Sequence, residues 1–202
     1  TSPLVNTVRD GQDMSRRLEQ MGYEVLQHRD VDSGAFVSAV HEFHTSLRPG
    51  DEAFFYFAGH GLQYQSDNWL ISTDEPKNEL EVKQKAVSAQ DVLSGMEQRR
   101  CRFSVLVLDC CRQYHAFPGM NRAFGSGGLA EMQAPAGSYI AFACAPGELA
   151  KDGMEYGLDN GVFTHYLLQH IDAPIDIDSM FIRVRRDVLK HTNGQQNQYT
   201  NS

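Results

Sequence analysis

Two reactive side-chain types follow two apolar stretches of this sequence. His60 stands in "FFYFAGHG" after an aromatic-rich run, and Cys110 and Cys111 stand in "LVLDCC" after an aliphatic run. An imidazole beside a thiol takes its proton, and the resulting thiolate attacks a carbonyl carbon. Each residue alone is more often structural. Together, at the ends of two expected strands, they form a candidate catalytic pair.

The alternation of side chains along a strand separates the two neighbouring cysteines. It places Asp109 and Cys111 on one face and Cys110 on the other. If the two strands are neighbours, Cys111 is the thiol that meets His60. The glycine after the histidine leaves the backbone N–H of Gly61 free to face a developing oxyanion, beside the N–H of Cys111. We therefore expect His60 to act as base and Cys111 as nucleophile.

These residues need a scaffold, and the surrounding pattern predicts an α/β fold. Strand-like runs lie at 23–28, 52–59, 102–111 and 138–145, and helical patterns lie at 8–21, 32–47 (capped by Asp32 or Ser33), 88–98 (capped by Ser88), 160–171 and 178–192. Several strands are apolar throughout, which is typical of a mostly parallel sheet with helices on both faces. Ligands bind outside the carboxyl ends of such strands, where His60 and Cys111 stand.

Composition narrows the class of protein. The chain has 202 residues, 41% of them hydrophobic, and a net charge of −8. Such a chain forms one domain, and its acidity disfavours nucleic acid or an anionic membrane as partner. The four cysteines (Cys101, Cys110, Cys111 and Cys144) form no CxxC pair. We therefore expect reduced thiols, a cytoplasmic location, and neither a zinc site nor a disulfide framework.

At this point the sequence resembles a known family. "YFAGHG", "LVLDCCR", "ACAPGE" and "NGVFTHYLL" together look like the caspase-like cysteine peptidases, and specifically the paracaspase and metacaspase branch. The resemblance runs over nearly the whole chain and is closest in pattern to paracaspases. It implies a single catalytic domain over 1–202, a caspase-like three-layer sandwich, and a dyad of His60 and Cys111 without an obligatory third residue. Because the chain opens with a helix, we expect its natural first strand to be absent. Because it stops abruptly at "QYTNS", we expect its natural C-terminal end to be absent as well.

Charge at the matched positions indicates the substrate. Caspases carry a glutamine where this chain has Asp109, and they cut after aspartate. By motif matching, Asp10 and Glu148 fall where paracaspases place further pocket acids. Three carboxylates would hold a guanidinium by charge-assisted hydrogen bonds and repel an acidic side chain. The resemblance therefore implies cleavage of peptides after arginine, with lysine as a lesser substrate.

Several alternatives stay open. The acidic run at 74–81, "DEPKNELE", is a conceivable calcium site, as metacaspases often require calcium, but it lacks the regular spacing of a calcium loop. We therefore expect no cofactor. His115 is a weaker candidate base. Arg122, in the segment after the nucleophile, is a candidate autocleavage site. Homodimerisation is open.

Two other functional readings also remain. One is a non-catalytic caspase-like scaffold that binds partners. The other is a different thiol hydrolase that acts on a small amide. The intact pair of His60 and Cys111 favours the peptidase over the scaffold.

Overall fold

The computed structural model describes residues 6–65, 67–111, 129–145, 150–151 and 153–202, without the side chain of Cys111. Its centre is a six-stranded sheet with strand order β3-β2-β1-β4-β5-β6. The strands are β1 (Glu52–Tyr64), β2 (Asp67–Ile71), β3 (Ala86–Ser88), β4 (Phe103–Cys111), β5 (Ser138–Phe142) and β6 (Tyr199–Asn201). The helices are α1 (Thr7–Gln20), α2 (Ser33–Ser46), α3 (Glu79–Lys85), α4 (Ala89–Gln98), α5 (Val162–His170) and α6 (Ile177–His191), with a 3₁₀ turn at Gly153–Tyr156.

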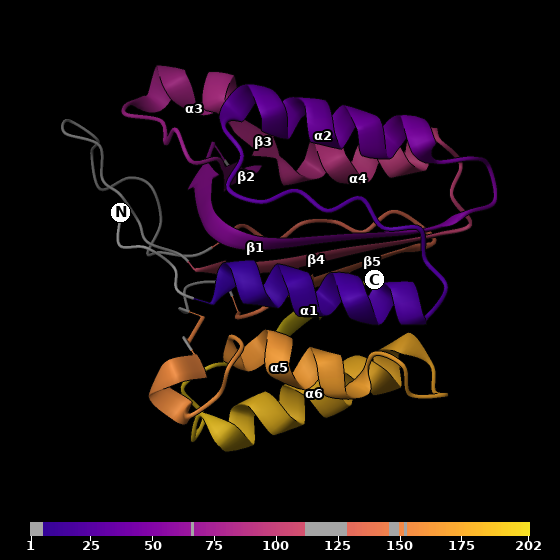
Figure 1. Cartoon of the computed structure of the whole chain (residues 1–202), viewed down its shortest axis with the longest axis vertical. Helices are drawn as coiled ribbons and strands as arrows, with labels where there is room; N and C mark the ends of the chain where they lie inside the picture. Colours follow the sequence, from indigo (N-terminus) through magenta and orange to yellow (C-terminus); the bar gives the residue numbers. More distant parts are fainter. Residues whose placement is uncertain (1–5, 66, 112–128, 146–149, 152) are drawn as a thin grey trace.

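Three layers result, with α2, α3 and α4 above the sheet and α1, α5 and α6 below it (Figure 1). The central strands β1, β4 and β5 are parallel, whereas β2, β3 and β6 pair antiparallel at the edges. The α/β sandwich with helices on both faces is confirmed. The short strands β2, β3 and β6 were not predicted from the sequence.

The apolar core is divided by the sheet into two halves. Along β4, Leu106, Leu108 and Cys110 pack toward α2 and α4, while Val105 and Val107 pack toward α1, α5 and α6. This is the strict alternation expected of a strand buried on both faces. It confirms the predicted separation of Asp109 from Cys110, because the two residues continue the same alternation.

Strand β1 is longer than predicted and has a second partner beside β4. Residues 52–60 pair with β4, and residues 61–64 continue the same strand and pair with β2. Figure 1 shows the resulting curve at the carboxyl end of β1. The expectation that the strand ends at "AGHG" is therefore wrong. The second ladder satisfies the backbone polar groups after Gly61, so the chain continues as a strand.

The predicted helix caps are confirmed at atomic level. The Asp32 side chain accepts a hydrogen bond from the Ala35 N–H at 2.8 Å, and the Ser88 hydroxyl accepts one from the Asp91 N–H at 3.3 Å. These bonds satisfy backbone donors that have no partner within the helix.

The strand expected at 23–28 is not present. This segment is mostly exposed, and it is not part of the six-stranded sheet. Residues 129–137 have no helix or strand, although Leu129 and Met132 are buried. None of the helices in the described ranges is long and apolar enough to cross a lipid bilayer.

Candidate active site

The two strands that carry the candidate pair are direct neighbours. β1 and β4 pair in parallel from Glu52 opposite Phe103 to His60 opposite Cys111. His60 and Cys111 form the last pair of this ladder, at the carboxyl end of β4 and at the point where β1 leaves β4 to pair with β2. This is the edge of a parallel sheet where ligands bind. The backbone therefore brings the histidine and the cysteine together, while the Cys111 side chain lies outside the described part of the structure.

His60 also lies on the face of the sheet that the proposed chemistry needs. Tyr56 of β1 packs with the cluster of α1, α5 and α6. His60 is four residues further along the strand and so shares this face with Tyr56. By the same alternation Asp109 of β4 is on this face too. The face toward α1 and α5 thus gathers the histidine and the acidic residue.

The opposite face explains the glycine after the histidine. A Cβ atom at Gly61 would lie 3.0 Å from Cβ of Cys110 and 3.1 Å from Cδ2 of Leu129. Cys110 itself is only 2% exposed. Close packing against Cys110 and Leu129 therefore favours glycine at position 61. Cys110 occupies a core position, as predicted, and the oxyanion role of the Gly61 and Cys111 N–H groups stays a prediction.

Asp10 and Asp109 converge from distant parts of the sequence. Asp10 of α1 is 3% exposed and Asp109 of β4 is 9% exposed. The Gly161 N–H donates to Oδ1 of Asp10 at 3.0 Å. A Cβ atom on Gly161 would lie 3.3 Å from Oδ2 of Asp10 and 3.5 Å from Oδ2 of Asp109. The two carboxylates therefore face the same backbone position, and Asp10 is buried beside Asp109.

The first turn of α5 supplies further donors to this pair. Gly161 is the N-cap of α5, and the Thr164 hydroxyl donates to Oδ2 of Asp109 at 2.5 Å. The Tyr56 hydroxyl lies 2.6 Å from Oγ1 of Thr164. Because the Thr164 proton goes to Asp109, Tyr56 is the donor in this second bond. The positive end of the α5 dipole also favours negative charge here.

Burial and mutual repulsion oppose the ionisation of these acids. Desolvation, followed by the neighbouring charge of Asp109, raises the pKa of Asp10 from 3.8 to about 7. Desolvation also raises the pKa of Asp109 to about 6, against the lowering effect of the Thr164 hydrogen bond. Burial and the charges of Asp109 and Asp10 raise the pKa of Tyr56, which stays a neutral donor. Two buried carboxyl groups at one site favour holding a proton between them.

Nearby cations pair with a different acid. Arg9 and Arg16 both form ion pairs with Asp13, and the Asn160 amide donates to Asp13 at 3.0 Å. Across the described ranges, neither Asp10 nor Asp109 has an ion pair with lysine or arginine. The pair is therefore a buried acidic site that lacks a countercharge from the described residues.

Sequence reasoning missed part of this site. Tyr56, Gly161 and Thr164 were not singled out as site residues. Gly161 and Thr164 lie within the matched motif "NGVFTHYLL", and Thr164 is a hydroxyl in an otherwise apolar helix start. The predicted residues Glu148, Arg122 and His115 lie outside the described residues.

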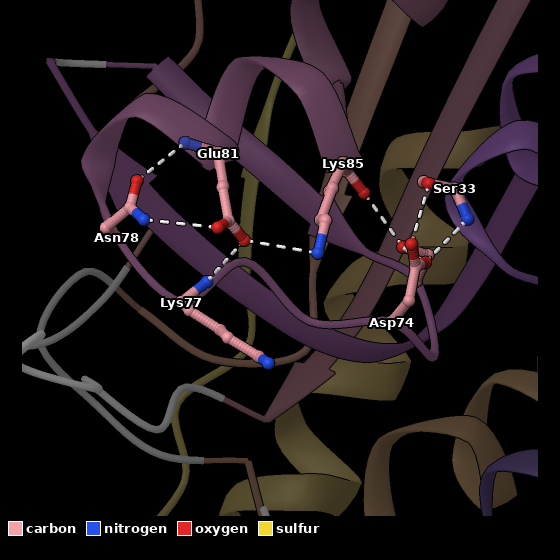
Figure 2. A network of polar contacts seen from close by, with 7 residues as sticks. Ser33, Asp74, Lys77, Asn78, Glu81 and Lys85 are labelled. Atoms are coloured by element: carbon pink, nitrogen blue, oxygen red, sulfur yellow. Dashed lines mark hydrogen bonds and ion pairs between the residues drawn. The ribbon is translucent and has the colours of Figure 1, made fainter.

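The acidic run at 74–81 forms local protein contacts (Figure 2). The carboxylate of Glu81 accepts from the Lys77 N–H and the Asn78 amide and pairs with Lys85 Nζ at 3.1 Å. Asn78 in turn accepts from the Glu81 N–H, which completes a reciprocal cap of α3. The acidic run at 74–81 thus includes the start of a capped helix.

Asp74 is held in the same way at the other end of this network. Its carboxylate accepts hydrogen bonds from the backbone and hydroxyl of Ser33, at 2.7 and 2.8 Å, and from the Ser72 hydroxyl at 2.9 Å. These bonds lower the pKa of Asp74. Within the described ranges, no group of three or more His, Cys, Asp and Glu side chains is arranged to hold a metal ion.

The sequence of this chain is similar to those of known proteins. The family model of the caspase domain matches residues 1–202. The chain belongs to the caspase family. Its caspase domain is similar to the mouse protein "Mucosa-associated lymphoid tissue lymphoma translocation protein 1 homolog", with 24% identity over 189 residues, covering 94% of this chain and 21% of the relative. The human "Mucosa-associated lymphoid tissue lymphoma translocation protein 1" is also 24% identical, over 94% of this chain and 22% of its own length.

These findings confirm the resemblance to caspase-like peptidases, with the paracaspases as the related branch. The caspase domain spans about a fifth of the length of the relatives that it matches.

Proposed function

We propose that this caspase domain is a cysteine endopeptidase that cleaves peptide bonds after arginine, and less well after lysine, by a dyad of Cys111 and His60. One observation carries the proposal: the buried pair of Asp10 and Asp109 belongs to the same sheet end as the matched positions of His60 and Cys111. The proposed reactive pair lies on the neighbouring strands β1 and β4, and the proposed cation-binding acids lie beside it on β4 and α1.

In the proposed reaction His60 accepts the Cys111 proton, and the thiolate attacks the carbonyl carbon of the scissile bond. Backbone N–H groups of Gly61 and Cys111 stabilise the oxyanion. His60 then returns the proton to the leaving amine, and water hydrolyses the thioester. No cofactor takes part in these steps.

The substrate arginine would enter the pocket formed by Asp10 and Asp109. Its guanidinium provides the countercharge that the described residues do not, and its planar fork fits carboxylate oxygens better than an ammonium does. Glu148 is proposed as a third acid. An acidic substrate side chain would meet two buried carboxyl groups and be rejected.

The deciding experiment is hydrolysis of matched fluorogenic peptides that end in arginine, lysine or aspartate. We expect cleavage after arginine, weaker cleavage after lysine, and none with the Cys111→Ala variant. Cleavage after aspartate would overturn the pocket assignment but preserve the dyad. If no peptide is cleaved while an arginine peptide still binds, the non-catalytic scaffold is the better reading.

Autoprocessing at Arg122 is a separate part of the proposal. An arginine-directed peptidase would cut its own chain there. We expect purified active protein to contain two fragments, and an Arg122→Ala variant to stay intact. A single intact chain with full activity would contradict autoprocessing without affecting the dyad.

A further inference from the structure

The hydroxyl of Thr164 is buried and forms hydrogen bonds with two partners. Thr164 is 0% exposed. Its oxygen accepts from the Tyr56 hydroxyl at 2.6 Å, and its proton is donated to Oδ2 of Asp109 at 2.5 Å. A threonine hydroxyl in a helix commonly bonds to the carbonyl four residues earlier in its own helix. Thr164 instead connects α5 to β1 and β4.

The two carboxylate oxygens of Asp109 differ in their hydrogen bonding. Oδ2 accepts the Thr164 hydrogen bond, and Oδ1 accepts none from the residues that the structure describes. A carboxylate that accepts a bond from a fixed donor keeps one orientation in a buried site. One oxygen is thus committed to the protein, and the other is left for a cationic ligand.

We propose that Thr164, held in turn by Tyr56, is a positioning residue of the arginine pocket, which fixes Asp109 so that one carboxylate oxygen meets the substrate guanidinium. This inference rests on the proposed arginine specificity and adds a residue to it. Tyr56 and Thr164 act through Asp109 alone.

The ionisable surroundings set the direction of the pH effect. Asp10 of α1 faces Asp109 across Gly161, Asp13 adds negative charge near Asp10, and Tyr56 and His60 share the same face of β1. Asp109 must be ionised to bind the guanidinium. The hydrogen bond from Thr164 lowers the pKa of Asp109, so its removal shifts arginine recognition to higher pH.

The test compares Thr164→Val, which removes the hydroxyl at constant shape, with Thr164→Ser, which retains it. We expect Thr164→Val to raise KM for the arginine peptide about tenfold or more and to change kcat less than about twofold. The preference for arginine over lysine falls, and the acid limb of kcat/KM moves to higher pH. Thr164→Ser restores all three.

Thr192→Val is the matched control. Thr192 is also buried, at 1% exposed, and its hydroxyl donates to the Val188 carbonyl of α6 and accepts from the Gln196 N–H, without a hydrogen bond to Asp10 or Asp109. A purely structural loss of a hydroxyl lowers stability without moving KM, the arginine preference or the pH profile. The inference is overturned if Thr164→Val folds, can be labelled completely by an irreversible thiol reagent, and leaves KM, the arginine preference and the pH profile unchanged, as Thr192→Val does. The inference is also overturned if Thr164→Ser changes KM, the arginine preference and the pH profile as much as Thr164→Val does.

Two further measurements keep the test decisive. If Thr164→Val does not fold, Tyr56→Phe must show a smaller change in the same direction. In the Cys111→Ala background, calorimetry with an acetylated peptide that ends in an arginine amide measures binding without turnover, and Thr164→Val must weaken it. A parent protein that neither cleaves nor binds arginine peptides refutes the proposed function, and the role of Thr164 with it. An arginine-directed parent with an unaffected Thr164→Val refutes this inference alone.

Discussion

The carboxyl groups of Asp10 and Asp109 lie against the same backbone position, Gly161, although one belongs to α1 and the other to β4. Their repulsion is not relieved by a lysine or arginine among the described residues. A site of this kind is unfavourable for the empty protein and favourable for a cationic ligand.

The first prediction concerns the stability of the empty protein. The pKa of Asp10 is raised on folding from 3.8 to about 7, so the folded state holds the proton more tightly than the unfolded chain. The contribution of this group to stability is therefore present below about pH 4 and is lost as pH rises toward about 7. Asp10→Asn mimics the protonated form, and we expect it to be ~1–3 kcal/mol more stable than the parent at pH 8.

Urea unfolding at pH 4 and at pH 8 measures this difference, which should vanish at the lower pH. Asp13→Asn is the control, because Asp13 is ion-paired and its loss should not stabilise the protein. The same Asp10→Asn variant should lose most cleavage after arginine. If the stability of Asp10→Asn and of the parent depended equally on pH, Asp10 would not be the carboxyl group whose pKa is raised on folding.

The second prediction uses the space in front of Gly161. Its φ of −53° suits any residue, so an alanine there adds a methyl group without backbone strain. The methyl carbon would approach both carboxylates, at 3.3 and 3.5 Å. We expect Gly161→Ala to raise KM for arginine peptides about tenfold through crowding of the pocket.

Steady-state kinetics with arginine peptides provides the measurement. Gly34→Ala in the first turn of α2 is the matched control, because its Cβ would make one ordinary contact with Asp32 at 3.6 Å. Both variants should fold. Unchanged KM in Gly161→Ala would mean that the substrate does not approach this backbone.

The third prediction tests the packing that favours Gly61. An alanine Cβ would lie 3.0 Å from Cβ of Cys110 and 3.1 Å from Cδ2 of Leu129. We expect Gly61→Ala to lower the free energy of unfolding by about 1–3 kcal/mol, as overpacking of a core does. Thermal or urea unfolding measures the loss. Because Leu129→Ala opens space beside the new methyl group, the double variant should lose less than the sum of the two single variants. Simple additivity would show that Leu129 and residue 61 do not compete for space.

The fourth prediction concerns metal ions. The carboxylates of Asp74 and Glu81 are occupied by donors of the protein itself. We therefore expect a chelator to leave both peptidase activity and the melting temperature unchanged. Asn78→Ala should instead lower stability by about 0.5–2 kcal/mol, because it removes the cap of α3. Activation by calcium that disappears in Glu81→Gln would reverse this assignment and establish a calcium site at 74–81.

Most of the fold could be predicted from local patterns. The period of Phe36 and Val40 indicates α2, and Asp32 is a helix cap by residue type alone. The continuous apolar run of β4 indicates a strand buried on both faces. Short edge strands such as β3 and β6 carry only three residues each, too few to show a period, and their pairing depends on neighbours distant in the sequence. The continuation of β1 past His60 likewise depends on β2.

Residue types and motif spacing are local properties of the chain, and they were sufficient to predict the family and the candidate roles of His60, Cys111, Asp10 and Asp109. The pairing of His60 with Cys111 across two strands and the burial of Asp10 against Gly161 became known only from the tertiary structure. It alone revealed Tyr56 and Thr164 as the donors behind Asp109. These relationships join β1, β4, α1 and α5, and register, burial and hydrogen-bond geometry between distant segments exist only once the chain has packed.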